Sequence, residues 1–335
     1  MLTRPFLNGN NWCKSSDEFE ELNILNNVIY TLDIQKAAFV LLPFSINFYF
    51  QCKNVKLLEE INETCKKLNI QAFGYISGDF GVVFPNFSNI IYYRQGGFKS
   101  QLSHQNKGFI VGLSDHFQRL YQKETITPTT KPEIPIIGFC GHATLSTTKR
   151  AKELVKCLLE NFRRFQKNPF NKVYEPFFAS AYERAKLLHY FEQSNLVKTN
   201  FIHRKKYRGG ALTEQERTAT TLEYYDNILH SDYVLCVRGA GNFSVRFYET
   251  MMMGKIPIFV NTDCLLPFED TINWKKHVVW VEWKDRKNIA QQVADFHATL
   301  SNDAFMNLQL ENRKLWKETL SVQGILEMIE NEIKA

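Results

Sequence analysis

The chain has 335 residues, a length at which one hydrophobic core usually gives way to two, so we expect two domains. Hydrophobic residues make up 44% of it and include 27 Phe, which excludes a disordered protein and supplies large side chains for two cores. The formal net charge of +6 favours an anionic small ligand or an anionic membrane surface, and it is too small to indicate a nucleic-acid partner.

The seven cysteines are scattered and never form a Cys-x-x-Cys pair, so they predict neither a disulfide framework nor a zinc site. A reducing compartment is the setting that this usage favours. The N-terminal segment lacks the apolar stretch of a signal peptide, and no run of about 18 apolar residues appears in the chain. We therefore expect a cytoplasmic protein, with peripheral contact to the inner face of a membrane as an added expectation.

Strand-like and helix-like segments alternate in the first half of the chain. Apolar or alternating runs at 36–44, 71–78 and 89–97 predict strands, and an amphipathic stretch at 54–69 predicts a helix. Residues 121–135 are polar, carry three prolines and show no apolar periodicity, which is typical of a linker. We therefore expect an N-terminal domain over 1–125, a second domain over 126–310 and a helical tail over 311–335.

The same alternation continues through the second half. It predicts strands at 134–141, 199–207, 233–237, 256–260 and 277–283, with helices at 149–165, 213–230 and 287–300 between them. Such alternation is typical of doubly wound α/β domains with parallel sheets.

The segment RGAGNFSVRFYETMMMGKIPIF, Arg238 to Phe259, predicts a turn, a helix and a strand directly after an apolar strand. Free backbone N–H groups and the positive end of the helix would converge on one point, which is an arrangement that binds phosphate. Gly239 and Gly241 would let the backbone approach an anion, and Asn242 or Ser244 could cap the helix or contact the ligand. The alternative is that the glycines only shape the turn and Ser244 only caps the helix.

Arg246 and Glu249 are three residues apart and therefore share one face of the predicted helix. An arginine there can bind a diphosphate with two N–H groups, and a carboxylate can accept both hydroxyls of a ribose. The alternative interpretation is that Arg246 and Glu249 form an ordinary surface ion pair and bind no ligand. The turn also matches a Gly-x-Gly-x-x-Ser variant of the dinucleotide-binding turn, in which Asp263 would hold the ribose of an oxidoreductase cofactor.

The stretch from Ser231 to Val281 resembles the signature of exostosin-type glycosyltransferases. The pattern consists, in order, of a serine before a strand, an Arg-Gly turn, Ser-x-Arg-x-x-Glu, Gly-x-Ile-Pro, Leu-Pro-Phe and Ile-x-Trp. In this chain its residues are Ser231, Arg238, Gly239, Ser244, Arg246, Glu249, Gly254, Ile256, Pro257, Leu266, Pro267, Phe268, Ile272 and Trp274. Weaker similarity extends upstream to residue 36. The resemblance implies a GT-B fold: two Rossmann-like, doubly wound domains that face a central cleft, the N-terminal one binding the acceptor and the C-terminal one the nucleotide sugar.

The resemblance also implies a reaction. A sugar would pass, with inversion, from a nucleotide diphosphate sugar, with a UDP-sugar as the expected donor, to a glycan or lipid-linked acceptor in surface polysaccharide synthesis. Glu249 would hold the ribose, Arg246 and Ser244 would contact the diphosphate, and Arg150 would add positive charge. The other residues expected at the donor site are Arg208, Arg238, Gly239, Gly241, Asn242 and Phe243. A non-catalytic glycan-binding protein that keeps the fold is the further alternative.

Inversion by direct displacement needs a general base on the acceptor hydroxyl. We expect the base at the end of a strand of the first domain, with Asp79 in YISGDFG as the first candidate, Asp115 as the second and His104 as the third. The alternative for Asp79 is a plain turn residue. The sequence has no Asp-x-Asp motif, and arginines with backbone N–H groups can neutralise the leaving group, so we predict that no metal or other cofactor is needed.

Overall fold

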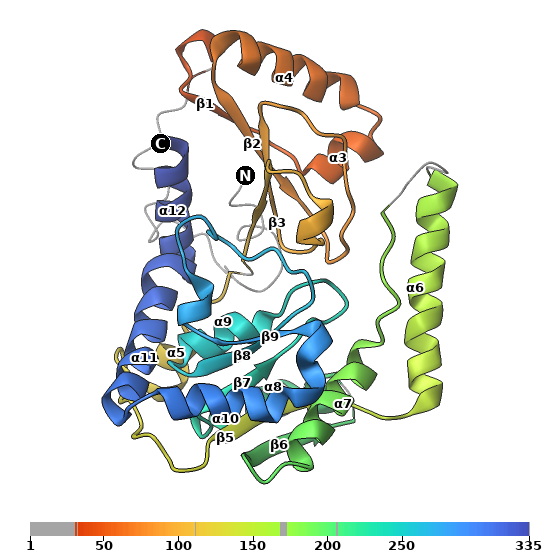
Figure 1. The fold of residues 1–335 in the computed structure, drawn as a ribbon. Coiled ribbons are helices and arrows are strands. Elements are labelled where there is room, and N and C mark those ends of the chain that lie inside the picture. The colour runs from red at the N-terminus through yellow and green to blue at the C-terminus, as the bar shows by residue number, and fades with distance from the viewer. Residues whose placement is uncertain (1–30, 32, 111, 168–172, 206, 335) are drawn as a thin grey trace. The chain divides into compact units, whose positions relative to one another are not determined.

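The computed structural model describes residues 31, 33–110, 112–167, 173–205 and 207–334, and the remainder is the thin grey trace in Figure 1. The chain divides into two compact units. The first contains Met1–Ser114, Asp263–Ile272 and Trp316–Ala335, and the second contains Asp115–Thr262 and Asn273–Leu315. This division differs from the expected ranges 1–125, 126–310 and 311–335, because two later segments of the chain return to the first unit.

The first unit is built on four parallel strands in the order β1 (Phe39–Leu41), β2 (Gln71–Ile76), β3 (Ile90–Arg94) and β4 (Asn106–Gly108). The helices α3 (Ile46–Gln51) and α4 (Val55–Leu68) connect β1 to β2. Ile46 and Leu58 are fully buried against the sheet and form the core with β-strand residues such as Ala72 and Ile90. Within the described residues, the strand order of this sheet shows no reversal.

The segment Asp263–Ile272 is held to the first unit by polar contacts. The Asp263 carboxylate accepts hydrogen bonds from the Ser100 backbone N–H at 3.1 Å and from its hydroxyl at 2.6 Å, while Lys107 pairs with Asp270 at 2.6 Å. Gly108 has to be glycine, because a Cβ there would lie 2.3 Å from the Leu266 carbonyl oxygen. Asp263 is therefore engaged by Ser100, which argues against the alternative that it holds a cofactor ribose.

The C-terminal part of the first unit is helical. A π-helical turn, η6 (Trp316–Leu320), leads into α12 (Val322–Lys334), where Glu332 accepts a 2.5 Å hydrogen bond from the hydroxyl of Tyr93 on β3. Burial and the charge of Glu332 raise the pKa of Tyr93, so its hydroxyl stays a donor.

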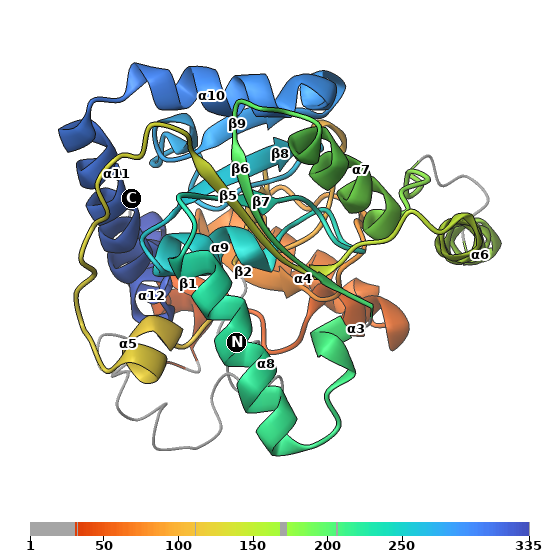
Figure 2. The same cartoon turned by 90° about the horizontal axis from the view of Figure 1, so that it is seen from below.

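The second unit has a five-stranded parallel sheet in the order β6 (Lys198–Arg204), β5 (Ile136–His142), β7 (Tyr233–Cys236), β8 (Ile256–Asn261) and β9 (Val279–Glu282). Helices α7 (Ser180–Glu192) and α10 (Ile289–Thr299) lie on one side of it, and α8 (Glu214–Leu229) and α9 (Val245–Met252) on the other (Figure 2). All four residues of β7 are buried, as expected for a strand covered on both faces. The predicted α/β class with parallel sheets flanked by helices is confirmed.

Three further helices complete the second unit: α5 (His116–Tyr121), α6 (Thr147–Lys167) and α11 (Asn302–Leu315). The helix ends follow the local sequence. A capping box of Thr213 and Glu216 begins α8, and Gly254, with φ of 66°, follows the end of α9. A Cβ on Gly254 would lie 2.2 Å from the Ile126 side chain, so packing as well as conformation requires glycine. Among the described residues, no helix is long and apolar enough to cross a bilayer.

Candidate functional site

The glycine-rich turn lies where the strand order of the second sheet reverses. The chain runs outward from β5 to β6 on one side and from β7 to β8 on the other, so the carboxyl ends of β5 and β7 flank the switch point. In parallel α/β sheets, ligands bind outside the carboxyl ends of the strands at this position. Residues 237–244 connect β7 to α9 there, and the predicted strand, turn, helix and strand are confirmed as β7, this turn, α9 and β8.

The backbone of the turn does not need its glycines for conformation. Neither Gly239 nor Gly241 has a positive φ, and a Cβ on Gly239 would meet no atom within 4 Å. The Gly239 N–H donates to the Phe243 carbonyl oxygen at 3.3 Å, so one of the expected N–H donors is used inside the turn. The open space beside Gly239 favours a ligand-related reason for glycine over the alternative that it only shapes the turn.

Ser244 and Asn242 differ in how their side chains are used. Ser244 occupies the N-cap position of α9, but its side chain makes no capping hydrogen bond, so it is not the simple cap that the alternative supposed. Asn242 is buried, donates to the Thr262 carbonyl oxygen at 3.0 Å and accepts from the Thr262 hydroxyl at 2.6 Å. Asn242 therefore joins the turn to the end of β8, and its expected ligand contact stays a prediction.

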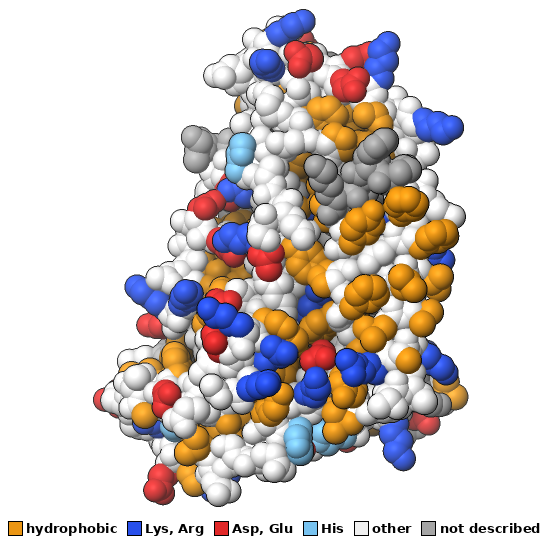
Figure 3. Space-filling model, turned by 45° about the vertical axis from the view of Figure 1, so that its right-hand side comes forward, with side chains coloured by type: hydrophobic (Ala, Val, Ile, Leu, Met, Phe, Trp, Pro, Cys, Tyr) orange, Lys and Arg blue, Asp and Glu red, His pale blue; other side chains and the backbone are white. Residues whose placement is uncertain are grey.

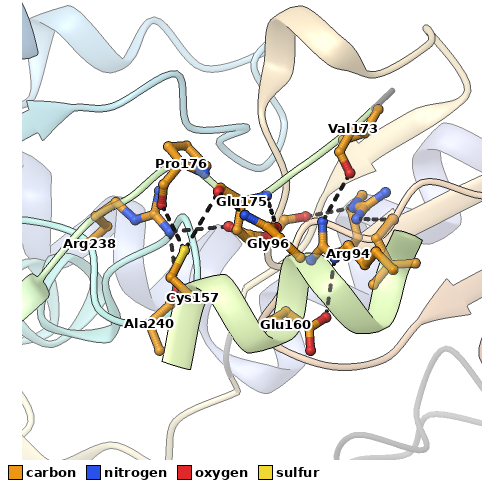
Figure 4. Close-up of polar contacts among 12 residues, drawn as sticks. Arg94, Gly96, Cys157, Glu160, Val173, Glu175, Pro176, Arg238 and Ala240 are labelled. Carbon is orange, nitrogen blue, oxygen red and sulfur yellow. Dashed lines mark hydrogen bonds and ion pairs between the residues drawn. The ribbon is translucent and has the colours of Figure 1, made fainter. Parts of the chain in front are cut away.

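Arg238 is also a structural residue. It is 3% exposed, donates to the Ala240 carbonyl oxygen at 3.0 Å and lies 3.6 Å from Glu175 (Figure 4). Glu175 in turn pairs with Arg164 of α6 at 2.9 Å. Its guanidinium also lies over the Phe178 ring, 4.8 Å from the centroid. These buried contacts give Arg238 a structural role, and its expected contact with the donor stays a prediction.

Arg246 lies at the carboxyl ends of the two strands beside the switch point. Its Nη2 donates to the Cys140 carbonyl oxygen at 2.8 Å, and its guanidinium stacks on the Phe139 ring at 4.3 Å. A Cβ on Gly141 would lie 2.9 Å from this nitrogen, so glycine makes room for the arginine. The buried Nε–H of Arg246 has no acceptor within the described part of the chain.

Glu249 is held by two tyrosines of α8 that the sequence analysis did not identify. Its carboxylate accepts hydrogen bonds from the hydroxyls of Tyr224 at 2.5 Å and Tyr225 at 3.2 Å. Burial, followed by the charge of Glu249, raises the pKa of both tyrosines well above the ordinary value, so both hydroxyls remain donors. The ring of His116 lies 4.9 Å from that of Tyr225, and burial lowers its pKa to about 4, so this aromatic neighbour is neutral at pH 7.

Arg184 of α7 is a second cationic residue at this edge that the sequence analysis missed. It donates to the carbonyl oxygen of His142, the last residue of β5, at 2.8 Å, and its buried Nε–H lacks an acceptor among the described residues. Burial and the charge of Arg246 lower its pKa to about 10. The two arginines therefore place positive charge at this edge of the sheet, which a diphosphate would compensate.

The structure gives fewer contacts for the remaining residues that were predicted to bind the donor. Arg150 is exposed near the start of α6, where its guanidinium lies over the Tyr182 ring at 4.6 Å. Arg208 falls in the short 3-10 helix η3 (Tyr207–Gly210), and its side chain lies outside the described part of the chain. Phe243 is partly buried within the turn.

The structure separates the two candidate bases. Asp79 is exposed in the loop after β2, as expected, and Gly96 must be glycine because a Cβ there would lie 2.3 Å from the Asp79 carbonyl oxygen. Asp115 lies in the second unit, caps α5 and receives two hydrogen bonds from Arg313, at 3.0 and 2.6 Å. Those contacts give Asp115 a structural role, and its assignment as a base stays a prediction. The third candidate, His104, is an exposed turn residue.

Residues 31, 33–110, 112–167, 173–205 and 207–334 contain no group of three or more His, Cys, Asp or Glu side chains arranged to hold a metal ion.

Comparisons with known proteins agree with the site. Residues 169–295 match the exostosin GT47 domain. Exostosin-1 of Drosophila melanogaster is 27% identical over 104 residues, 31% of this chain and 13% of its own. A probable glucuronosyltransferase of Physcomitrium patens is 39% identical over 62 residues, which are 18% of this chain and 14% of the relative. A probable beta-1,4-xylosyltransferase of Arabidopsis thaliana is 36% identical over 62 residues, which are 18% of this chain and 15% of the relative.

Two solved structures of TarM are also similar to this chain. One is 13% identical with a TM-score of 0.32 and covers 80% of this chain and 51% of its own. The other is a point mutant of S. aureus TarM in complex with fondaparinux, alpha-GlcNAc-glycerol and UDP. It is 11% identical with a TM-score of 0.34, and the match covers 79% of this chain and 55% of the TarM chain.

This chain aligns with only 13 to 15% of the length of the three relatives described above. The matched region nevertheless contains the whole segment from Ser231 to Val281 and most of the second unit, including Ser244, Arg246 and Glu249. The resemblance predicted from the motif is therefore confirmed, because residues 169–295 match the exostosin GT47 domain.

Proposed function

We propose that the protein is an inverting glycosyltransferase that transfers a sugar from a nucleotide diphosphate sugar to a glycan or lipid-linked acceptor in surface polysaccharide synthesis. The observation that carries the proposal is the arrangement around α9. Glu249 is fixed by two tyrosine hydroxyls. Arg246 lies at the switch point of the sheet, and its buried Nε–H has no acceptor among the described residues. Both residues belong to the region that matches the GT47 domain.

In this proposal, each group at the site has one task. Glu249 accepts the ribose hydroxyls, and because its carboxylate is already oriented by Tyr224 and Tyr225, little ordering is needed on binding. Arg246, with Arg184 beside it, neutralises the diphosphate as it leaves. The Ser244 hydroxyl and the open space at Gly239 complete the phosphate site.

The general base is proposed to be Asp79, whose carboxylate is exposed at the end of β2. Metal-independent chemistry, a UDP-sugar donor and a cytoplasmic location are parts of the same proposal. The paired arginines support metal independence, because they supply positive charge for the leaving group. An oxidoreductase is the weaker candidate, since the Asp263 carboxylate that its cofactor would need is bound by Ser100.

The donor site is tested by thermal shift with UDP, uridine and UMP, with and without magnesium. We expect UDP at about 100 times its dissociation constant to stabilise the wild type by roughly 2.7 kcal/mol. Glu249→Gln should lose most of the stabilisation by both UDP and uridine, because the ribose acceptor is weakened while the tyrosines keep a partner. A wild type that no nucleotide stabilises would indicate a non-catalytic glycan-binding protein, and an absolute need for magnesium would refute metal independence.

A second variant separates ribose recognition from diphosphate recognition. Arg246→Gln should weaken UDP about tenfold or more, a loss of about 1.4 kcal/mol, and leave uridine binding nearly unchanged. The preference for UDP over UMP should therefore collapse in this variant. The control is Arg204→Gln, since Arg204 forms a partly exposed ion pair with Glu223. An equal loss of uridine and UDP binding would show that Arg246 acts only by holding the fold.

A further inference from the structure

We propose that α6 is an interfacial helix that binds an anionic lipid surface. This property is independent of the proposed transferase activity, because it rests on an outward face of one helix and needs neither donor nor acceptor.

One side of α6 is fixed to the second unit. Arg164 is 9% exposed and pairs with Glu160 and Glu175. Asn161 exchanges two hydrogen bonds with the backbone of Glu175, at 2.8 and 2.9 Å. Glu153 accepts from the Ala181 backbone N–H at 3.2 Å. These contacts set which face of the helix points outward.

The outward face is apolar. Five large side chains recur along it at the spacing of one helical face and are each about half exposed, which is unusual for so many neighbouring apolar groups. They are Val155 (52%), Leu158 (55%), Leu159 (51%), Phe162 (54%) and Phe165 (48%). Hydrophobic side chains gather over α6 in Figure 3.

A basic strip runs along one edge of this apolar face. Its four members are exposed and spaced three, four and seven residues apart, so they share one side of the helix: Lys149, Lys152, Lys156 and Arg163. Both acidic residues of the helix, Glu153 and Glu160, are instead turned to the contacts described above. The outward surface of α6 therefore combines apolar side chains with a strip of positive charge.

This combination fits an anionic membrane surface. An amphipathic helix with Leu and Phe on one face and Lys and Arg beside it lies in the interface, with its apolar face among the acyl chains and its cations at the head groups. A helix of 21 residues is about 30 Å long, enough to lie along the surface over its whole length. A second copy of the chain is a poorer occupant, because it would bring the same positive strip into the interface.

The proposal is tested by sedimentation with vesicles of phosphatidylcholine alone and of phosphatidylcholine mixed with phosphatidylglycerol, without nucleotide. We expect the wild type to bind the mixed vesicles and to be released by salt. Leu159→Glu with Phe162→Glu should lower the partition coefficient at least tenfold. Lys152→Gln with Lys156→Gln should lower the partition coefficient about tenfold on anionic vesicles, since each lysine near the membrane surface adds electrostatic binding energy.

Matched controls make the result specific. Leu212→Glu changes an 84% exposed leucine outside α6, and Lys66→Gln with Lys67→Gln changes two exposed lysines of α4. Neither should alter vesicle binding. All altered side chains are exposed, so thermal melting should be close to that of the wild type. A wild type that ignores anionic vesicles would overturn the proposal, as would an oligomer in solution that Leu159→Glu with Phe162→Glu converts to a monomer.

Discussion

Replacing Glu175 by alanine is expected to lower the free energy of unfolding by about 3–5 kcal/mol, because the change leaves two buried arginines without their shared carboxylate. Arg238 and Arg164 are 3% and 9% exposed, and Glu175 is 4% exposed. The measurement is urea unfolding followed by far-UV circular dichroism.

Two comparisons decide whether the ion pairs cause this loss. Glu223→Ala removes a half-exposed partner of Arg204 and should cost no more than about 1 kcal/mol. Replacing Arg164, Glu175 and Arg238 together by methionine should recover much of the stability, since the three buried charges are removed together. A loss below about 1 kcal/mol for Glu175→Ala would mean that solvent reaches this cluster.

Asp79→Asn should reduce turnover by about 10²–10⁴-fold and leave UDP binding unchanged, because removal of a general base affects the proton transfer and not the donor site. The measurement is the rate of sugar transfer to acceptor, together with a UDP thermal shift on the same sample. The carboxylate is exposed at the end of β2, so the amide should not perturb the fold.

Asp115→Asn provides the contrasting result. Since Asp115 caps α5 and binds Arg313 through both oxygens, this variant should lose stability and retain its turnover per folded molecule. Near-normal turnover in Asp79→Asn would show that Asp79 is not the base, and His104 would then be the next candidate to test.

Much of the second unit could be predicted from the sequence, because strands covered on both faces appear as continuous apolar runs and the helices between them end at clear signals. Gly254 after α9 is an example, and β7 with its four buried residues is another. Helix α7 escaped prediction, because its buried residues, such as Ala181, Leu187 and Phe191, are spread around its circumference and give little helical periodicity. Arg184 was missed with it.

Several contacts at the site could not be predicted, and they share one cause. Arg238 and Asn242 lie in the right turn and have the right chemistry, but their partners, Glu175 and Thr262, are distant along the chain. No local pattern indicates that a side chain is already engaged by a group so far away. The tyrosines that hold Glu249 were missed for the same reason, since α8 precedes α9 by a whole strand.

The interleaving of the two units limits how this protein can be cut or recombined. The chain passes between them after Ser114, Thr262, Ile272 and Leu315. A gene fragment ending at the borders of the GT47 match, 169 and 295, would omit the interior strand β5 and retain a ten-residue excursion that belongs to the other unit. Grafting a new donor specificity onto a relative would therefore require exchange of several separate pieces, and a single crossover would leave both halves incomplete.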